Sequence, residues 1–315
     1  MSLAARRVVL TLTLILSISC ALRAGAAPAE PAPTATATAK AKPGLRVGVT
    51  LHPYYSWTKN VVGDTNVEVV PVLPGEVDAG DYQPRPDDIA RIADLDAIVI
   101  NGLGHDDFIQ DMIKASGNDK IVVIRPNEGT PLLKAAHGDS VNSHTFISFS
   151  NAIQQSYAIA KALGALRPAL AATFEQNAAL YARRLRAIKA NAASRIGDPR
   201  RKRVVTVHDG YGYLMQEFGI GIAGVVEPAH GLVPSAKELG DMVDLLNREH
   251  IRVVFSEETF PEPLLKVLRD EGHAKVYIIS HVAAGDYSPE EFEVVMQRNA
   301  DVLVEAMNAD DSKPE

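Results

Sequence analysis

Histidine is the residue type that most clearly offers chemistry in this chain of 315 residues, and the chain contains nine of them. The only cysteine, Cys20, lies in the N-terminal segment, so disulfides, thiolate metal clusters and cysteine nucleophiles are excluded from the rest of the chain. A metal ion bound there needs imidazole nitrogen and oxygen ligands. Because neutral imidazole is the commonest metal ligand in proteins, the placement of the histidines decides whether they can form a site.

Most of these histidines come directly after predicted β-strands. Those that follow a strand are His52, His105, His208, His230 and His281, and Glu257 and Glu258 follow another strand. In open parallel sheets, ligands bind beyond the carboxyl ends of the strands. One histidine at such a place is usually an ordinary loop residue, whereas several on the same edge of two lobes indicate a metal site. His250 and His273 precede strands, and we expect them to be surface residues.

Eight short runs rich in β-branched residues are the predicted strands. They cover residues 46–50, 67–72, 97–100 and 121–124 in the first half, and 204–207, 222–226, 252–255 and 276–279 in the second. Polar or amphipathic stretches separate them. Alternating strands and helices predict parallel sheets that are covered on both faces. Four strands in each half therefore predict an α/β fold of two similar lobes.

One long helix is predicted between the lobes. Pro168 stands at its start, Gly197 follows its end, and neither proline nor glycine occurs between them. Its apolar residues recur at steps of three and four and form one stripe: Phe174, Ala178, Tyr181, Leu185, Ile188 and Ala192. At 1.5 Å per residue the helix is about 40 Å long, enough to contact both lobes and limit how far they swing. The alternative is an ordinary amphipathic helix of one lobe.

The first 26 residues resemble an export signal. A basic pair, Arg6-Arg7, precedes an apolar run of about 15 residues, and small residues at 24–26 provide a cleavage site. We expect cleavage near Ala26 and a periplasmic protein, with an uncleaved anchor and a lipoprotein modified at Cys20 as alternatives. Residues 27–44 contain no bulky apolar side chain and are expected to be a disordered tether.

The net charge excludes some partners. It is −7 for the whole chain and −10 without the first 26 residues, which hold three arginines and no acidic residue. Such an acidic chain lacks the basic surface that nucleic acid or anionic lipid requires.

We expect a monomer with an N-terminal lobe over residues 45–150, a linking segment with the long helix over 151–198, and a C-terminal lobe over 199–310.

An ordered series of short motifs resembles a known family. The motifs are Leu51-His-Pro-Tyr54, Asp81-Tyr-Gln-Pro-Arg-Pro-Asp-Asp88, Asn101-Gly-Leu-Gly104, Ser143-His-Thr-Phe146, His208-Asp-Gly-Tyr-Gly-Tyr213, Phe255-Ser-Glu257 and Asn299-Ala-Asp-Val-Leu303. Over residues 46–307 the chain is similar to the zinc- and manganese-binding receptors of bacterial ABC importers. This resemblance implies two α/β lobes bridged by a long helix, a metal ion in the cleft between them, and a membrane permease as the partner.

The resemblance also implies a set of metal ligands. Carried over by position, they fall on His52, His144 and His208. The family's fourth ligand is an aspartate after the last strand, and here that place holds Ser280-His281, so His281 is the substitute. Four imidazoles favour Zn²⁺ over Mn²⁺, which prefers oxygen ligands. We expect Glu257 and Asp209 to orient the imidazoles or to act as alternate ligands.

Two features depart from the family pattern. Many members have a histidine where this chain has Gly80, and the long histidine-rich loop of many zinc-specific members is missing. His137 is the only residue left to represent that loop. The sequence assigns no role to His105, His137 or His230.

Other functions compete with that of a metal-binding receptor. Residues 219–224 match a dinucleotide-binding fingerprint, but a helix precedes and a strand follows, so we interpret them as a helix-terminating loop. A zinc hydrolase could use Glu257 as its general base, although the chain has no His-Glu-x-x-His motif. A periplasmic metal buffer or an adhesin could use the same site. We favour a binding protein without enzymatic activity that delivers zinc to a permease.

Overall fold

The computed structural model describes residues 44–75, 77–199, 203–227 and 231–309. The predicted signal peptide, nearly all of the predicted tether, and His230 lie outside the described residues. Within the described part, no helix is long and apolar enough to cross a membrane.

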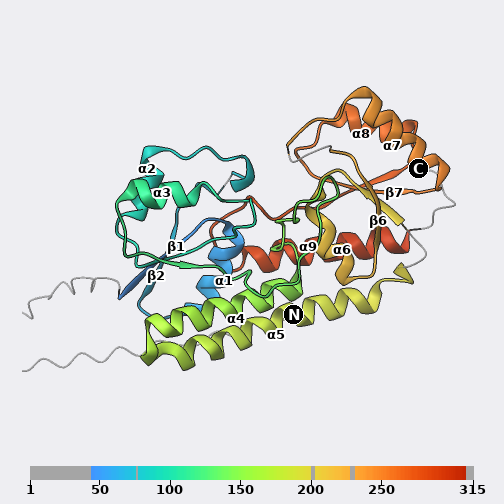
Figure 1. The fold of residues 1–315 in the computed structure, drawn as a ribbon. Coiled ribbons are helices and arrows are strands. Elements are labelled where there is room, and N and C mark those ends of the chain that lie inside the picture. Colours follow the sequence, from blue (N-terminus) through green and yellow to red (C-terminus); the bar gives the residue numbers. More distant parts are fainter. Residues whose placement is uncertain (1–43, 76, 200–202, 228–230, 310–315) are drawn as a thin grey trace, which may run out of the picture. The chain divides into compact units, whose positions relative to one another are not determined.

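The first lobe contains a parallel sheet of four strands (Figure 1). Its order is β2-β1-β3-β4, with the strands at Leu45–Val49 (β1), Val67–Pro71 (β2), Ala97–Val99 (β3) and Val122–Ile124 (β4). Helices at His52–Val62 (α1), Pro86–Ile92 (α2) and Ile109–Ser116 (α3) connect them. All three residues of β3 are buried, as expected for a central parallel strand that is covered on both faces.

The second lobe repeats this arrangement. Its parallel sheet has the order β6-β5-β7-β8, with strands at Arg203–Thr206 (β5), Gly221–Val225 (β6), Val253–Ser256 (β7) and Lys275–Ile278 (β8). Its helices are Gly212–Glu217 (α6), Ala236–Arg248 (α7) and Glu262–Asp270 (α8). Each of the eight strands begins and ends within about one residue of its prediction, so the fold class of two parallel-sheet lobes is confirmed.

The predicted long helix is confirmed as well. Helix α5 covers Ala171–Arg195, and a short 3-10 turn at Pro168–Leu170 (η2) precedes it. Every residue of the predicted apolar stripe is buried except Ile188, which is partly buried. Helix α4 (Phe149–Leu166) lies beside α5 (Figure 1).

Helix α5 contacts both lobes. Near its start, Asn177 Nδ2 donates to the carbonyl of Val61 in α1 at 3.0 Å. Near its end, Lys189 Nζ lies 3.2 Å from Glu217 Oε1 in α6. The glutamate also accepts from the backbone of Ser150 at the start of α4. The helix therefore ties the two lobes to one another, as predicted.

The last helix, α9 (Glu291–Asn308), is a second connection that the sequence analysis did not identify. It contacts α1 and α5 on one side and β8 on the other. The ring of Phe292 meets the ring of Trp57 in α1 at 5.1 Å between centroids. The C-terminal segment therefore packs against the first lobe as well as the second.

Two hydrophobic cores support this arrangement. The larger one combines the first sheet, helices α1, α4, α5 and α9, and one face of the second sheet; Val47, Trp57, Tyr181 and Phe255 are among its members. The smaller one lies between the second sheet and helices α7 and α8. Because the larger core includes residues of both lobes, it holds the carboxyl ends of the two sheets in a fixed position relative to one another.

Replacing Trp57 by alanine should lower the free energy of unfolding by about 3–5 kcal/mol. The Trp57 side chain is fully buried and makes edge contacts with Tyr54 and Phe292, at 5.0 and 5.1 Å between centroids. Denaturant unfolding of the metal-free protein measures the change. Val294→Ala, at a position that is 51% exposed on α9, is the control and should change it little. A loss below about 1 kcal/mol for Trp57→Ala would contradict the central position of this side chain in the core.

Candidate metal site

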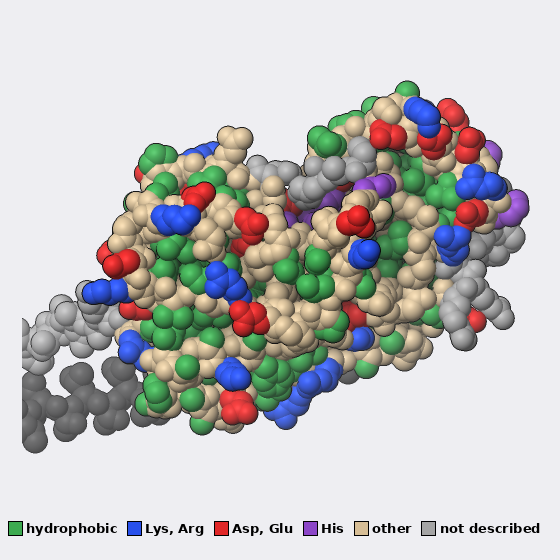
Figure 2. Space-filling view, in the orientation of Figure 1, with side chains coloured by type: hydrophobic (Ala, Val, Ile, Leu, Met, Phe, Trp, Pro, Cys, Tyr) green, Lys and Arg blue, Asp and Glu red, His purple; other side chains and the backbone are tan. Residues whose placement is uncertain are grey.

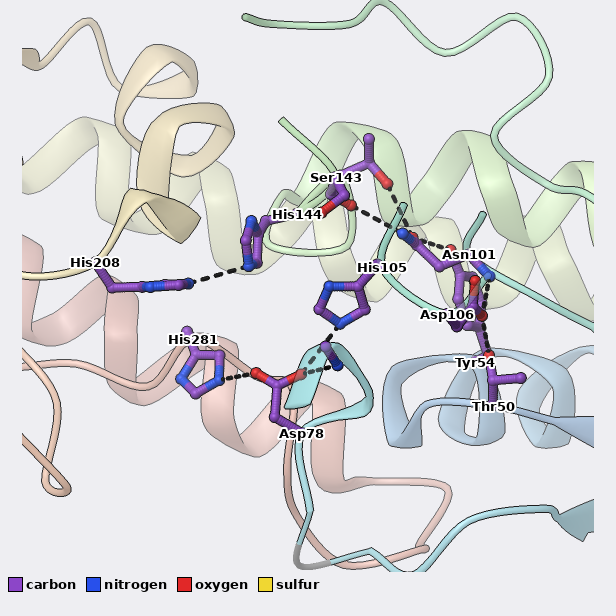
Figure 3. A network of polar contacts seen from close by, with 12 residues as sticks. Thr50, Tyr54, Asp78, Asn101, His105, Asp106, Ser143, His144, His208 and His281 are labelled. Atoms are coloured by element: carbon purple, nitrogen blue, oxygen red, sulfur yellow. Dashed lines mark hydrogen bonds and ion pairs between the residues drawn. The ribbon is translucent and has the colours of Figure 1, made fainter. Parts of the chain in front are cut away.

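Four histidines and one aspartate from loops of both lobes meet at one place (Figure 3). Asp78 follows β2, His105 follows β3, His144 precedes α4, His208 follows β5 and His281 follows β8. The first three histidines are between 4% and 7% exposed. Figure 2 shows histidine side chains gathered in a hollow of the surface.

His144 and His208 make a direct contact between the lobes. Their Nε2 atoms are 3.0 Å apart, and their rings are almost perpendicular. Two nitrogens that bind one tetrahedral zinc ion at 2.0–2.1 Å lie about 3.3 Å from one another. The two imidazoles therefore stand close to the spacing that a shared zinc ion requires.

The opposite nitrogen of three of these rings is held by a side-chain oxygen. The Nδ1 contacts are His144 with Asn142 Oδ1 at 3.1 Å, His208 with Glu227 Oε2 at 2.9 Å, and His281 with Glu257 Oε2 at 2.9 Å. An acceptor at Nδ1 fixes the ring and its tautomer, and it leaves Nε2 as the nitrogen for a metal ion. The three Nε2 atoms are thus directed toward the shared site.

Asp78 lies between the Nε2 atoms of His105 and His281. Its Oδ1 is 3.2 Å from His105 Nε2, and its Oδ2 is 2.9 Å from His281 Nε2. Burial raises the pKa of Asp78, but the hydrogen bonds from the two histidines outweigh burial and hold that pKa well below its usual range. The carboxylate is therefore charged at neutral pH.

His281 stands between two carboxylates. Burial lowers its pKa, but the hydrogen bonds to Asp78 and Glu257 together raise it to about 10. The pKa of Glu257 is lowered because His281 overcomes the effect of burial, and the hydroxyl of Tyr211 also donates to this carboxylate at 3.0 Å. At neutral pH His281 is consequently a cation, and a metal ion must displace its proton.

The loop that carries His281 is held from α9. The side chain of Asn299 accepts from the backbone N–H of Ser280 at 2.9 Å and donates to its carbonyl at 2.7 Å. The next residue, Val282, has a φ of +63°, which is rare for a β-branched residue and costs about 1–2 kcal/mol. Its backbone N–H donates to Ser280 Oγ at 3.0 Å. The surrounding contacts therefore maintain a strained turn beside the site.

His52 occupies a different position from the other predicted ligands. It is the first residue of α1 and only 1% exposed, and its ring packs against Gly285, where an added Cβ would lie 3.0 Å from the His52 ring. Burial and the charge of His281 lower the pKa of His52 to about 4, against the opposing effect of hydrogen bonds with the backbone of Val282 and Ala284. The structure thus brings together His144, His208 and His281, whereas these contacts do not test the expectation that His52 is a ligand.

The structure also shows which residues surround the histidines. Glu257 Oε2 lies 2.9 Å from His281 Nδ1. Asp209 accepts from the backbone N–H of Ala136 at 2.7 Å and so holds the loop beside the site. That either residue orients a metal-binding imidazole or acts as an alternate ligand stays a prediction. Sequence reasoning did not select Asp78, Asn142 or Glu227. A usable signal existed for Glu227, because it follows the sixth strand as His208 follows the fifth.

The site can be reached from a cavity of about 210 Å³. His144, His208 and Glu227 line its inner side, and His137 and Asp209 also line it. In the part of the chain that the structure describes, no three potential ligands are yet arranged as a complete metal shell. A metal ion bound here would have to replace the contacts between imidazoles and carboxylates with its own bonds to them.

Comparison with known proteins identifies the family of this chain. Residues 47–306 match the family described as "ZnuA: Zinc-uptake complex component A periplasmic". The chain belongs to this ZnuA family. Its members are periplasmic metal-binding receptors, so the predicted family is confirmed and a hydrolase receives no support.

Among solved structures, the solute-binding protein FpvC of Pseudomonas aeruginosa is similar to this chain. FpvC in complex with Mn²⁺ is 46% identical, covers 84% of this chain and 98% of its own, and has a TM-score of 0.78. FpvC in complex with Ni²⁺ gives 44% identity, 84% and 96% coverage, and a TM-score of 0.77. The two complexes show that this similar protein holds ions other than zinc.

Curated ZnuA-like proteins are more distant. A putative metal-binding protein of Treponema pallidum is 28% identical over 249 residues, which cover 75% of this chain and 78% of that protein. The zinc-binding lipoprotein AdcA of Streptococcus pneumoniae is 24% identical over 277 residues, which cover 82% of this chain and 55% of AdcA. The present chain therefore spans about half the length of AdcA.

Proposed function

We propose that this ZnuA-family protein binds one divalent metal ion, foremost Zn²⁺, and delivers it to the permease of an ABC importer. The observation that carries the proposal is the group of imidazole Nε2 atoms at the carboxyl ends of two sheets, with the Nδ1 atoms of His144, His208 and His281 held by acceptors. Such acceptors orient imidazole rings for a metal ion. The family membership supports a receptor role rather than catalysis.

We propose His105, His144, His208 and His281 as the nitrogen ligands, with the carboxylate of Asp78 as an oxygen ligand or a close neighbour of the ion. His105 enters this set because its Nε2 already faces Asp78, and its ring lies 5.3 Å from that of His144. His52, by contrast, packs against the segment after His281. Glu227, Glu257 and Asn142 hold the rings in place.

The ion would connect the two lobes, because His105 and Asp78 belong to the first lobe and His208 and His281 to the second. Helices α5 and α9 contact both lobes, so we expect binding to rearrange loops and tilt the lobes slightly, without a wide hinge closure. Small-angle scattering with and without zinc tests this, and a large contraction would contradict it.

The metal preference follows from the donor set. Four nitrogen ligands favour zinc. Manganese prefers more oxygen ligands than the single carboxylate of this site supplies. Metal-free protein titrated in competition with a chromogenic chelator should bind one Zn²⁺ per chain, at least about tenfold more tightly than Mn²⁺. Tighter binding of Mn²⁺ would refute the zinc preference, and binding of neither ion would refute the proposed function. Growth under chelation tests delivery to the permease. A strain that lacks the gene should recover growth with added zinc when the gene is supplied again.

The location is part of the proposal. Cleavage near Ala26 would release a monomeric receptor into the periplasm, and modification of Cys20 would instead anchor it to a membrane. Both outcomes place the receptor outside the cytoplasm, in agreement with the family. The intact mass of the mature protein distinguishes the two.

A further inference from the structure

The side chain of Asn101 lies between the loops that carry His105 and His144 (Figure 3). It is 2% exposed. Its Nδ2 donates to the carbonyl of Gly102 at 2.9 Å and to the carbonyl of Ser143 at 3.0 Å. Gly102 begins the loop that leads to His105, and Ser143 directly precedes His144. One amide group thus holds the backbone of both loops.

The orientation of this amide is fixed by its other neighbours. Asn127 Nδ2 donates to the backbone carbonyl of Asn101 at 2.9 Å and to Asn101 Oδ1 at 3.1 Å. A backbone carbonyl only accepts hydrogen bonds, so the Asn127 group that faces Asn101 is the amide N–H. Tyr54 in α1 also donates to Asn101 Oδ1, at 2.8 Å. A flipped Asn101 amide would point its N–H groups at these donors.

The loop after Asn101 needs such support. Three consecutive residues, Gly102, Leu103 and Gly104, have φ values of +68°, +59° and +91°. For a residue with a side chain, such as Leu103, this region costs about 1–2 kcal/mol. A backbone of this kind persists only where its surroundings hold it.

A buried carboxylate provides the second support. Asp106, fully buried and adjacent to His105, accepts hydrogen bonds from the N–H groups of Asn101 and Gly102 at 2.7 and 2.5 Å. It also accepts from the hydroxyl of Thr50 at the end of β1, at 2.5 Å. The His105 loop is therefore wrapped around one carboxylate and tied to the His144 loop by one amide.

We propose that Asn101 is a positioning residue that sets the separation of His105 and His144, and thereby the affinity and the coordination geometry of the metal site, without touching the ion. The proposal rests on the proposed function. Its basis is that the two carbonyls bound by one buried amide belong to Ser143, next to His144, and to Gly102, which begins the strained loop to His105. Without the amide, the strained loop loses its link to Ser143, and the two imidazoles become free to separate.

Cobalt(II) is a suitable probe because its visible absorption reports the number and geometry of its ligands. Titration of metal-free Asn101→Ala with Co²⁺ should show binding about 10–100-fold weaker than that of the parent, the usual range for loss of a group that orients ligands. The intensity of the visible bands should change as well. Thermal unfolding of the metal-free proteins is measured in parallel.

Asn118 provides a matched control. Its Nδ2 donates to two carbonyls of the same lobe, those of Ile92 at 3.0 Å and Leu95 at 2.8 Å, but it has no link to the histidine loops. Asn118→Ala should lose stability and keep the affinity and the spectrum of the parent. Asn101→Ala with the affinity and spectrum of the parent would overturn the proposal, whatever its stability.

A second pair of variants covers the case in which Asn101→Ala does not fold. Thr50→Val removes one donor to Asp106 and preserves volume, and Thr50→Ser retains the hydroxyl. Thr50→Val should weaken Co²⁺ binding and alter the spectrum, and Thr50→Ser should restore both; a Thr50→Val protein like the parent would overturn the proposal. A parent that binds no Co²⁺ overturns the proposed function itself, and that outcome is visible without any variant.

Discussion

His105→Ala should lower the affinity for Zn²⁺ by about 100-fold or more, whereas His52→Ala should leave it within a few-fold of the parent. The reason is the position of each ring. His105 Nε2 lies 3.2 Å from Asp78 in the group that joins both lobes, while His52 packs against the backbone beyond His281. The loss of His105 also removes one of the two imidazoles that face Asp78.

Chelator competition with the metal-free proteins measures both affinities. His250→Ala is the matched control, because this exposed histidine lies before β7, at the opposite end of the sheet. The substitution should leave the affinity for Zn²⁺ unchanged. The reverse ranking, with His52→Ala as the damaging change, would establish the ligand set that the family resemblance implies and would exclude His105. Because His52→Ala also removes a buried side chain, its unfolding has to be measured alongside.

Zinc affinity should rise with pH well above the ordinary pKa of histidine. Hydrogen bonds to Asp78 and Glu257 hold the pKa of His281 at about 10, so its proton competes with the metal ion across the neutral range. Between pH 7 and 9 the affinity should increase by about tenfold per pH unit, because one proton leaves for each ion bound.

Calorimetry in buffers of different ionisation enthalpy counts the protons that are released. The parent should release about one proton per zinc ion at pH 8, and His281→Ala should release about one fewer. Equal proton release by the two proteins would show that His281 does not carry the displaced proton. The zinc affinity of His281→Ala should also change less with pH than that of the parent.

The same pKa has a consequence for stability without metal. A pKa raised in the folded state stabilises the protein fully below the unfolded value of about 6.5 and loses this contribution as the pH rises through about 10. The free energy of unfolding of the metal-free protein should therefore decline between these values. Zinc binding should offset that decline, since an ion that binds only the folded state stabilises it by mass action.

Local patterns in the sequence determined the elements of this fold. Runs of β-branched residues predict all eight strands, and the apolar stripe that includes Tyr181 and Leu185, bounded by Pro168 and Gly197, predicts the long helix. These signals are local because side-chain periodicity and the intrinsic preference of a residue for helix or strand depend on neighbours within a few residues. Helix α9 was not identified, because the sequence analysis used its residues only as a motif.

The chemistry of the site was accessible from the sequence only in part. The absence of cysteine after Cys20 and the histidines after strands indicate an imidazole metal site, and His144, His208 and His281 do meet in the structure. Which other groups join them depends on loops far apart in the chain. Asp78 and His281, for example, are separated by 203 positions and lie 2.9 Å apart.

Only the tertiary structure decided the orientation of the rings. A histidine at the end of a strand can turn toward the metal site, as His105 does, or pack beneath it, as His52 does, and both positions have the same local sequence signal. The difference arises from contacts across the lobes: Asp78 draws His105 and His281 together, and Glu227 and Glu257 hold the other imidazole nitrogens. Such contacts become definite only when both sheets are packed on one core, because that packing brings the carboxyl ends of their strands within hydrogen-bonding distance.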